Sequence, residues 1–374
     1  MTWAYRTLLR PALFCQDSEK IHDRTLRALA WASRHKTICQ LLASLFHPAD
    51  LPVELFGLKF PNPIGLAAGM DKHAAAVPVW SALGFGFSEL GGVTRHAQPG
   101  NPAPRMFRAV ADQALVNRMG FNNDGADAMA ARLAEWRTQN RWPAHPVGIN
   151  LGKSKITPLA EAAGDYAYSL RALWPHADFF VVNVSSPNTP NLRQLQDKTA
   201  LDEILATLQE TNNALAKKHP TSRAALPILV KVAPDLSFEA LDEILELASP
   251  RHIAGIVATN TTISRPAARD PRLQRIYSEA GGLSGRPLSA RSTEVIRHIR
   301  RQTRGQLPIV GSGGIFNADD AWEKIIAGAS LVQIYTGLVF EGPGVTRKIV
   351  DGLRLKLKSS GFNSLSQAVG SQSD

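Results

Sequence analysis

The run Asn183–Pro190 reads NVSSPNTP and places a serine between two asparagines directly after an apolar segment. Asparagine side chains donate and accept hydrogen bonds at once, so Asn183 and Asn188 suit the amide and carboxylate edges of a planar ligand. The run holds no histidine and the chain has no Gly-x-Ser-x-Gly elbow, which disfavours an acyl-transfer serine. Ser186 is therefore a candidate for proton transfer, with a structural Ser-Pro turn as the alternative.

Polar residues also end several other short apolar runs. Lys231 lies inside the apolar run Ile228–Val232, and burial of its charge would be costly without an anionic partner; a salt bridge to Asp235 is the structural alternative. The pair Gly313-Gly314 would let backbone amides approach an anion closely, although a tight turn would use the same residues. The chain has no GxGxxG fingerprint, so one phosphate and a polar rim favour a mononucleotide over a dinucleotide cofactor. The other polar residues of this set are Asp71, Lys72, Asn150, Thr259, Asn260, Thr261, Tyr335 and Thr336.

Eight short, nearly continuous apolar runs alternate with helix-compatible segments from residue 63 onward. Such runs are typical of parallel strands that are buried on both faces. The pattern predicts an α/β protein with a (β/α)8 TIM barrel, and a doubly wound open sheet is the alternative. The carboxyl ends of the strands form the active site in such a barrel, so these polar residues would gather on one rim. The predicted strands are Ile64–Gly69, Phe87–Thr94, Pro146–Gly152, Phe179–Ser185, Pro227–Ala233, Gly255–Thr261, Pro308–Gly314 and Leu331–Gly337.

Residues 1–50 differ from the barrel. They contain two amphipathic segments, which predict helices over Ser18–Arg34 and Lys36–Phe46. Periodicity alone favours a helical hairpin packed on the barrel, and a pair of helices lying in a membrane interface is the alternative. The chain then divides into an N-terminal helical extension (1–50), a barrel (51–358) and a flexible tail (359–374) rich in Ser, Gln and Gly.

Charge and cysteine usage restrict the partners. The chain carries 42 Lys and Arg against 32 Asp and Glu, a formal charge of +10. The positive residues are scattered, which disfavours a nucleic-acid partner and leaves an anionic membrane surface or an anionic small substrate. Cys15 and Cys39 form no metal-binding spacing, so no metal is expected. No run reaches the ~18 apolar residues of a membrane span, and no signal peptide is expected.

Nine sequence blocks follow one another as they do in dihydroorotate dehydrogenases, and they cover the barrel nearly from end to end. The chain resembles class 2 of that family, the quinone-dependent and membrane-associated form. Two features select this class: the base position is serine, Ser186, where class 1 enzymes carry cysteine, and the N-terminal helical extension is present. The blocks are LAAGMDK (66–72), NRMGFNN (117–123), GINLGK (148–153), NVSSPNTP (183–190), VKVAPD (230–235), ATNTT (258–262), GGLSGRPL (281–288), GSGGI (311–315) and LVQIYTG (331–337).

The resemblance implies a reaction and a role for each matching position. (S)-Dihydroorotate would be oxidised to orotate in de novo pyrimidine (UMP) biosynthesis, with a hydride passed to one FMN per chain and electrons to ubiquinone or menaquinone. Ser186 would be the base that removes the C5 proton, and His22, Arg108 and Tyr335 would lie near the quinone tunnel. The substrate-binding positions are Lys72, Asn117, Arg118, Met119, Gly120, Phe121, Asn183, Asn188, Asn260 and Thr261. The cofactor-binding positions are Ala68, Gly69, Met70, Asp71, Lys72, Gly92, Asn150, Asn183, Lys231, Thr259, Gly285, Gly314, Tyr335 and Thr336.

The resemblance further implies a monomeric, peripheral membrane protein on the cytoplasmic face of the cell membrane. Residues 1–50 would dock on the membrane and enclose the quinone access path, so their removal should abolish quinone turnover and leave reduction by dihydroorotate intact. The nearest alternative is a related FMN barrel that oxidises another dihydropyrimidine or uses fumarate or NAD as acceptor.

One position departs from the family. Many members have Gly-Thr-Val-Thr where this chain has Gly91-Gly92-Val93-Thr94. A flavin contact made by the threonine side chain would be lost at Gly92, whereas a contact made by the backbone would be unchanged.

Overall fold

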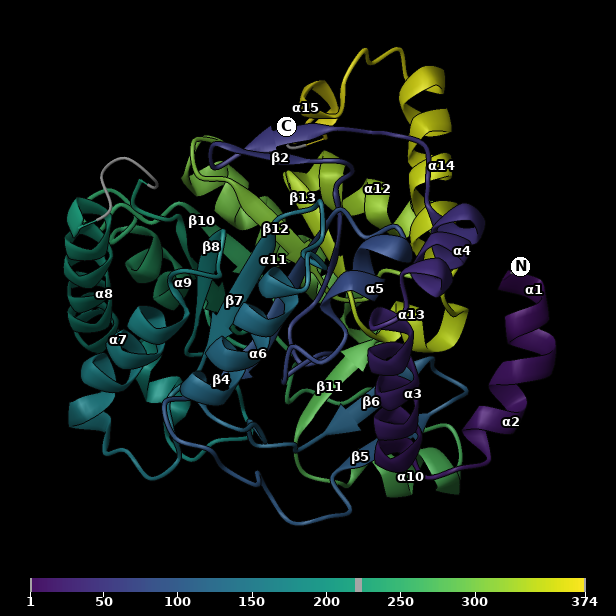
Figure 1. Cartoon of the computed structure of the whole chain (residues 1–374), viewed down its shortest axis with the longest axis horizontal. Helices are drawn as coiled ribbons and strands as arrows, with labels where there is room; N and C mark the ends of the chain where they lie inside the picture. The colour runs from purple at the N-terminus through teal and green to yellow at the C-terminus, as the bar shows by residue number, and fades with distance from the viewer. Residues whose placement is uncertain (1, 219–223, 373–374) are drawn as a thin grey trace.

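Eight parallel strands close into a barrel in the order β3-β4-β7-β8-β9-β10-β12-β13 in the computed structural model, which describes residues 2–218 and 224–372 (Figure 1). Nearly every residue of these strands is buried, because helices cover the outer face and side chains fill the interior. All eight predicted strands and the predicted (β/α)8 barrel are confirmed. The strands are β3 (Ile64–Leu66), β4 (Phe87–Val93), β7 (Val147–Leu151), β8 (Phe179–Asn183), β9 (Ile228–Val232), β10 (Gly255–Ala258), β12 (Ile309–Ser312) and β13 (Leu331–Ile334).

Helices follow the strands on the outside of the barrel. On α8, for example, Leu201, Ile204, Leu205 and Leu208 recur at helical spacing and are all buried. Asn317 begins α12 by accepting hydrogen bonds from the amides of Asp319 and Asp320. The barrel helices are α5 (Val77–Ala82), α6 (Ala126–Thr138), α7 (Ala162–Leu173), α8 (Lys198–Lys218), α9 (Phe238–Leu245), α10 (Pro271–Tyr277), α11 (Ser289–Gln302), α12 (Ala318–Ala327), α13 (Thr336–Glu341) and α14 (Val345–Ser359).

Two small antiparallel sheets lie outside the barrel, and the sequence pattern did not predict them. β1 (Val53–Leu55) and β2 (Leu58–Phe60) form a hairpin whose Phe60 packs on Phe87, with ring centroids 5.5 Å apart. The second sheet has the order β11-β6-β5 and contains β5 (Met106–Ala109), β6 (Ala114–Asn117) and β11 (Gly282–Gly285). Its β6 ends at Asn117, so this sheet delivers one of the predicted substrate residues.

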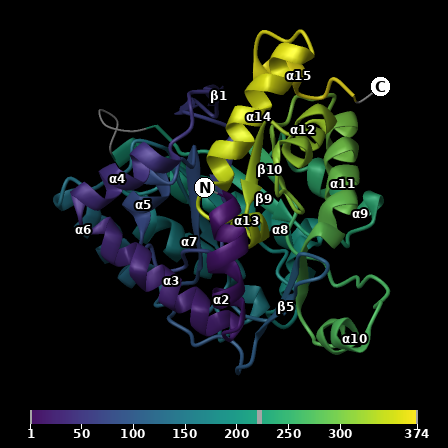
Figure 2. The same cartoon turned by 90° about the vertical axis from the view of Figure 1, so that its right-hand side faces the viewer.

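The N-terminal segment lies along one side of the barrel (Figure 2). It consists of α1 (Thr2–Ala4), a π-helical stretch (Tyr5–Leu9), α2 (Arg10–Phe14), α3 (Ser18–Ser33) and α4 (Lys36–Phe46), so both predicted helices are confirmed. Asp17 caps α3 by accepting hydrogen bonds from the amides of Glu19 and Lys20 at 3.1 and 3.0 Å.

The end of the chain contains a further short helix, where the composition predicted a flexible tail. The short helix α15 (Leu365–Ala368) buries Leu365 and Ala368. The amides of Gly370 and Gln372 donate to the carbonyls of Ile325 and Ile326, both at 3.0 Å. Two apolar anchors and these backbone bonds thus hold the tail on α12 as far as residue 372, and residues 373–374 lie outside the described part. The flexibility of the tail stays a prediction.

None of the helices in the described residues is both long and apolar enough to cross a bilayer. The same part of the chain holds no group of three or more His, Cys, Asp or Glu side chains placed to bind a metal ion.

Candidate active site

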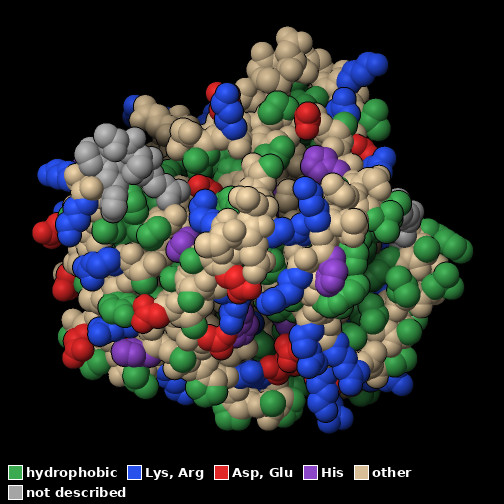
Figure 3. All heavy atoms as spheres, viewed as in Figure 1, with side chains coloured by type: hydrophobic (Ala, Val, Ile, Leu, Met, Phe, Trp, Pro, Cys, Tyr) green, Lys and Arg blue, Asp and Glu red, His purple; other side chains and the backbone are tan. Residues whose placement is uncertain are grey.

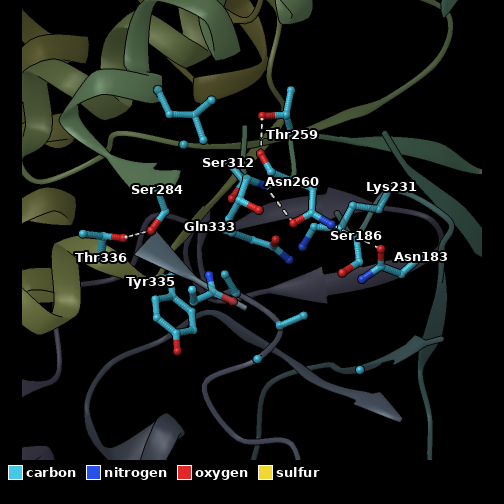
Figure 4. Close-up of a pocket in the computed structure, with 18 of the residues that line it drawn as sticks. Asn183, Ser186, Lys231, Thr259, Asn260, Ser284, Ser312, Gln333, Tyr335 and Thr336 are labelled. Carbon is cyan, nitrogen blue, oxygen red and sulfur yellow. Dashed lines mark hydrogen bonds between the residues drawn. The ribbon is translucent and has the colours of Figure 1, made fainter. Parts of the chain in front are cut away.

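A polar pocket opens at the carboxyl ends of the barrel strands, and the loop after β8 brings Ser186 to its wall (Figure 4). Ser186 is buried, and its Oγ accepts a hydrogen bond from the amide of Asn188 at 3.3 Å. Asn183, Ser186 and Lys231 lie on one side of the pocket in Figure 4, and Tyr335 and Thr336 lie on the other. The predicted serine thus lines a cavity, and its hydroxyl also accepts the hydrogen bond of a local turn.

A network of inward-pointing polar side chains forms the floor of this pocket. Asn183 Nδ2 donates to Asn150 Oδ1 at 2.9 Å, and Asn150 Nδ2 donates to Glu89 Oε1 at 2.5 Å. Gln333 Nε2 also donates to the Glu89 carboxylate. Lys231 Nζ lies 3.5 Å from Glu89 Oε1. Glu89 is completely buried, so this cation and these two amides are what stabilise its charge.

The partner of Lys231 is therefore Glu89 and not Asp235. Asp235 Oδ2 instead lies 3.0 Å from Arg193 Nη1. β4 and β9 are not neighbours in the sheet, so Glu89 and Lys231 meet across the barrel interior. Glu89 was not among the predicted site residues, although a lone acid in the apolar run Phe87–Val93 is a signal that could have predicted it.

Lys72 forms a further part of the pocket wall, and an asparagine pair, Asn117 and Asn188, joins the end of β6 to the loop that carries Ser186. Asn188 Nδ2 donates to Asn117 Oδ1 at 3.2 Å, and Asn188 Oδ1 is buried with no hydrogen-bond partner among the described residues. Burial lowers the pKa of Lys72 to about 8, with a further lowering by Arg105 that Glu19, Asp23 and Asp71 oppose. A partly desolvated ammonium beside free amide groups suits an anionic ligand with amide edges.

The turn after β12 forms a third side of the pocket. Gly313 and Gly314 adopt φ of +126° and +72°, which L side chains rarely adopt. A Cβ on Gly314 would lie 2.4 Å from Ser289 Cβ, at the start of α11. Lys324, fully buried on α12, donates to the Ser289 carbonyl at 2.6 Å and to Thr293 Oγ1 at 2.5 Å. A turn with two glycines beside a helix start can present backbone amides to an anion.

An apolar pocket lies beside the polar pocket, between the N-terminal segment and the barrel. Its wall combines α3 residues with side chains from β5, β6 and the segment after β13, and it includes the predicted His22 and Arg108. Arg108 donates to the carbonyls of Phe14 and Gln16 at 2.8 and 3.0 Å. Burial, then Lys72 and His73, lower the pKa of His22 to about 3, so its imidazole is neutral at neutral pH. Tyr335 lines both pockets and connects them.

Most of the predicted catalytic, substrate-binding and cofactor-binding residues line the polar pocket, and four do not. Asp71 is buried below it, where it accepts hydrogen bonds from Trp80 Nε1 at 3.1 Å and from the amides of Ala75 and Ala76. Asn150 lies in the floor network, Met70 lines the apolar pocket, and Arg118 pairs with Glu279 at 2.6 Å. The predicted residues that do line the polar pocket are Ala68, Gly69, Lys72, Gly92, Asn117, Met119, Gly120, Phe121, Asn183, Ser186, Asn188, Lys231, Thr259, Asn260, Thr261, Gly285, Gly314, Tyr335 and Thr336.

The departure at Gly92 has a local explanation. A Cβ on Gly92 would lie 2.7 Å from Phe121 Cδ1 and 3.1 Å from Asn150 Oδ1. The Phe121 ring thus occupies the space that a threonine side chain would need, and Gly92 leaves room for it. Whether the Gly92 backbone contacts a flavin stays a prediction.

The structure is a (β/α)8 barrel with a pocket at the carboxyl ends of its strands and an adjoining apolar pocket. The dihydroorotate dehydrogenase family matches residues 50–357, and this chain belongs to that family. Similar relatives, both named dihydroorotate dehydrogenase (quinone), come from Gloeobacter violaceus (55% identity, covering 97% of this chain and 98% of the relative) and Nostoc punctiforme (52%, 98% and 97%). A solved Eimeria tenella structure, in complex with ferulenol, superposes with a TM-score of 0.83 at 35% identity and covers 95% of both chains. The family resemblance read from the sequence blocks is confirmed.

Proposed function

We propose that this chain oxidises dihydroorotate to orotate in pyrimidine biosynthesis, with FMN as its cofactor and a membrane quinone as the final electron acceptor. The observation that carries the proposal is the meeting of two pockets of opposite character at Tyr335. The polar pocket suits an anionic cyclic amide and a phosphate-bearing cofactor, and the apolar pocket suits a hydrophobic acceptor. Family membership and the names of the similar relatives support the same reaction.

The residues present fit FMN. Gly313 and Gly314 line the polar pocket with backbone alone, and Gln333 Oε1 is buried at the pocket with no hydrogen-bond partner among the described residues. We assign the phosphate to the Gly313-Gly314 turn and the polar edge of the flavin to Lys231, Gln333 and Thr259. FMN, when bound, supplies the hydride acceptor and passes the electrons on to the quinone.

We assign the substrate to the space between Ser186 and the Lys72 wall. Lys72 would hold the carboxylate, and Asn117, Asn188 and Asn260 would hold the ring amides. Removal of a proton beside a carbonyl builds negative charge, which the Lys72 ammonium and the asparagine donors stabilise. Ser186 Oγ would take the C5 proton, and the buried Thr189 hydroxyl, with no hydrogen-bond partner among the described residues, is available to carry it outward.

We propose that the protein docks on a membrane through residues 1–50, on the cytoplasmic face of the cell membrane. Hydrophobic side chains gather along the edge of the molecule where the N-terminal segment lies (Figure 3). Trp3, Leu8 and Leu41 are 71%, 66% and 60% exposed. Large apolar side chains so exposed on neighbouring helices mark an interaction surface. We further propose that the protein acts as a monomer, as the family resemblance implies.

The acceptor test separates this proposal from the fumarate- or NAD-linked alternative. We expect turnover of dihydroorotate with a short-chain ubiquinone or menaquinone analogue and none above background with fumarate or NAD. Mass measurement of the released cofactor should give FMN. Efficient turnover with fumarate or NAD in place of the quinone would favour the alternative.

Orotate affinity should depend on pH through Lys72. The pKa of Lys72 is lowered to about 8, so its ammonium is present below that pH and is lost above it. The apparent Kd of orotate should therefore be flat below pH 8 and rise by up to about tenfold per pH unit above it. Orotate titrations monitored by flavin absorbance check this, and Lys72→Met serves as the control. An equal slope in Lys72→Met would assign the pH dependence to another group.

Gly314→Ala should weaken FMN binding by at least about tenfold, because the new Cβ would overlap Ser289 and the φ of +72° disfavours any side chain. The affinity for riboflavin, which lacks the phosphate, should fall less in this variant than the affinity for FMN. Fluorescence titration of the apoprotein measures both. Gly164→Ala on α7 is the matched control, since nothing lies within 4 Å of its Cβ position. Equal losses for FMN and riboflavin would place the phosphate elsewhere.

A further inference from the structure

Helix α3 contacts two parts of the protein with two of its faces. Ser18, Ile21, His22, Thr25 and Leu29 recur at helical spacing and line the apolar pocket. Glu19 lies beside this stripe and points to the barrel, where its Oε1 lies 2.7 Å from Arg105 Nη2 and accepts a hydrogen bond from Arg105 Nε at 2.8 Å. The two side chains are only 16% and 14% exposed, so solvent screens this fork-shaped ion pair much less than a surface pair.

Arg105 also binds the loop that precedes β5. Its Nη1 donates to the carbonyls of Pro99 and Asn101 at 2.6 and 2.7 Å. The Arg105 guanidinium therefore binds the Glu19 carboxylate through Nε and Nη2, and it binds the carbonyls of this loop through Nη1. Lysine has no such fork and could not make both sets of bonds.

Asn101 is where this loop meets the substrate side of the polar pocket. Its Nδ2 donates to the carbonyls of Arg118 and Asn188, both at 3.0 Å, and its backbone amide donates to the carbonyl of Met119 at 3.0 Å. The pocket residues Asn117, Met119 and Asn188 lie on the two segments that Asn101 ties together. An unbroken series of short polar contacts thus joins α3 to both segments.

We propose that Glu19 is a positioning residue for the substrate: through Arg105 and Asn101, it sets the geometry of the two segments that carry Asn117 and Asn188. Helix α3, which walls the apolar pocket, thereby also shapes the polar pocket. The inference rests on the proposed function, since it concerns how that function's substrate is held. Glu19 and Asp23 also favour the charged form of Lys72, which supports the same link between α3 and the substrate wall.

Removal of the N-terminal segment should then impair both the reduction of the flavin by dihydroorotate and its reoxidation by the quinone. The sequence-based expectation was that a chain without residues 1–50 keeps reduction by dihydroorotate. Removal of Glu19 takes away the carboxylate that fixes Arg105, and only its bonds to the Pro99 and Asn101 carbonyls remain. Substrate binding should therefore weaken together with quinone turnover.

The test uses the full-length holoenzyme with Glu19→Gln, Arg105→Lys and the double variant. We expect each single variant to weaken orotate binding by about tenfold with wild-type FMN content, and the double variant to be little worse than either. Arg24→Gln is the control, because this exposed α3 residue bonds to Gln16 on the surface and should leave orotate affinity unchanged. If the losses of orotate affinity in the two single variants multiply in the double variant, Glu19 and Arg105 act independently. That result would overturn the proposed series of contacts.

A pH profile distinguishes positioning from a general loosening of α3. Lys72 is faced by Glu19 and Asp23 from α3, by Arg105, by its neighbour Asp71, and by His22. Loss of the Glu19 carboxylate removes a charge that favours the ammonium, so the rise of the orotate Kd should begin at a lower pH in Glu19→Gln. Wild-type orotate affinity and pH profile in Glu19→Gln, with only thermal stability or quinone KM changed, would overturn the inference. Failure of dihydroorotate to reduce the wild-type flavin would instead contradict the proposed function.

Discussion

Replacement of Ser186 by alanine should slow the reduction of the flavin by dihydroorotate about 10³-fold and leave orotate affinity within about twofold of wild type. The hydroxyl is the group that we assign to the C5 proton, and it lies in the pocket wall between Asn183 and Asn188. Alanine removes the proton acceptor and keeps the volume of the wall nearly unchanged. The amide of Asn188 loses a 3.3 Å hydrogen bond, which is too long to contribute much to binding.

Rapid mixing under anaerobic conditions measures this rate directly, and orotate titration measures the affinity. Ser186→Cys is the matched variant, since it restores a proton acceptor at the same position. Its rate should recover in part and should rise with pH as the thiol ionises. Equal losses of rate and of orotate affinity in Ser186→Ala would instead make the serine a structural residue of the loop.

Replacement of Lys231 by methionine should lower the free energy of unfolding of the protein and also lower its flavin content. Glu89 is completely buried, and Lys231 Nζ lies 3.5 Å from its Oε1. Loss of one partner of a buried pair costs about 3–5 kcal/mol. We expect the lower end of this range, about 3 kcal/mol, because Asn150 and Gln333 still donate to the Glu89 carboxylate.

A double variant separates the effect on stability from the effect on chemistry. Lys231→Met with Glu89→Gln removes both charges, so most of the lost free energy of unfolding should return. Flavin content and reduction should stay low, because the cation beside the cofactor is still missing. Urea unfolding of the apoprotein and the flavin content after purification measure the two effects. A Lys231→Met protein with wild-type stability and wild-type flavin reduction would contradict both assigned roles.

The barrel could be predicted because each strand carries its own signal. Parallel strands covered on both faces appear in the sequence as short apolar runs, and all eight were found. The sheet β11-β6-β5 gave no such signal, since its strands are short and β11 pairs with β6 across more than 160 residues, as in Gly282 with Asn117. The helix α15 could not be predicted from the polar composition of the tail, because composition cannot show that Leu365 and Ala368 are buried.

The site residues at the strand ends could be predicted from the sequence, but the side chains that hold them in place could not. Ser186, Asn183 and Lys231 stood out as polar residues in or beside apolar runs. The partner of Lys231 was sought four residues away at Asp235, but closure of the barrel brings Glu89 from the opposite side of the interior. Likewise, the pair of Glu19 with Arg105 joins residues 86 positions apart, which no local pattern reveals.

The central claim is tested most directly by a single experiment on the wild-type holoenzyme. Anaerobic addition of dihydroorotate should bleach the long-wavelength absorbance of the flavin with the appearance of one orotate per flavin reduced. Subsequent addition of a quinone analogue should restore the colour, and addition of fumarate or NAD should not. A flavin that stays oxidised in the presence of dihydroorotate would contradict the account.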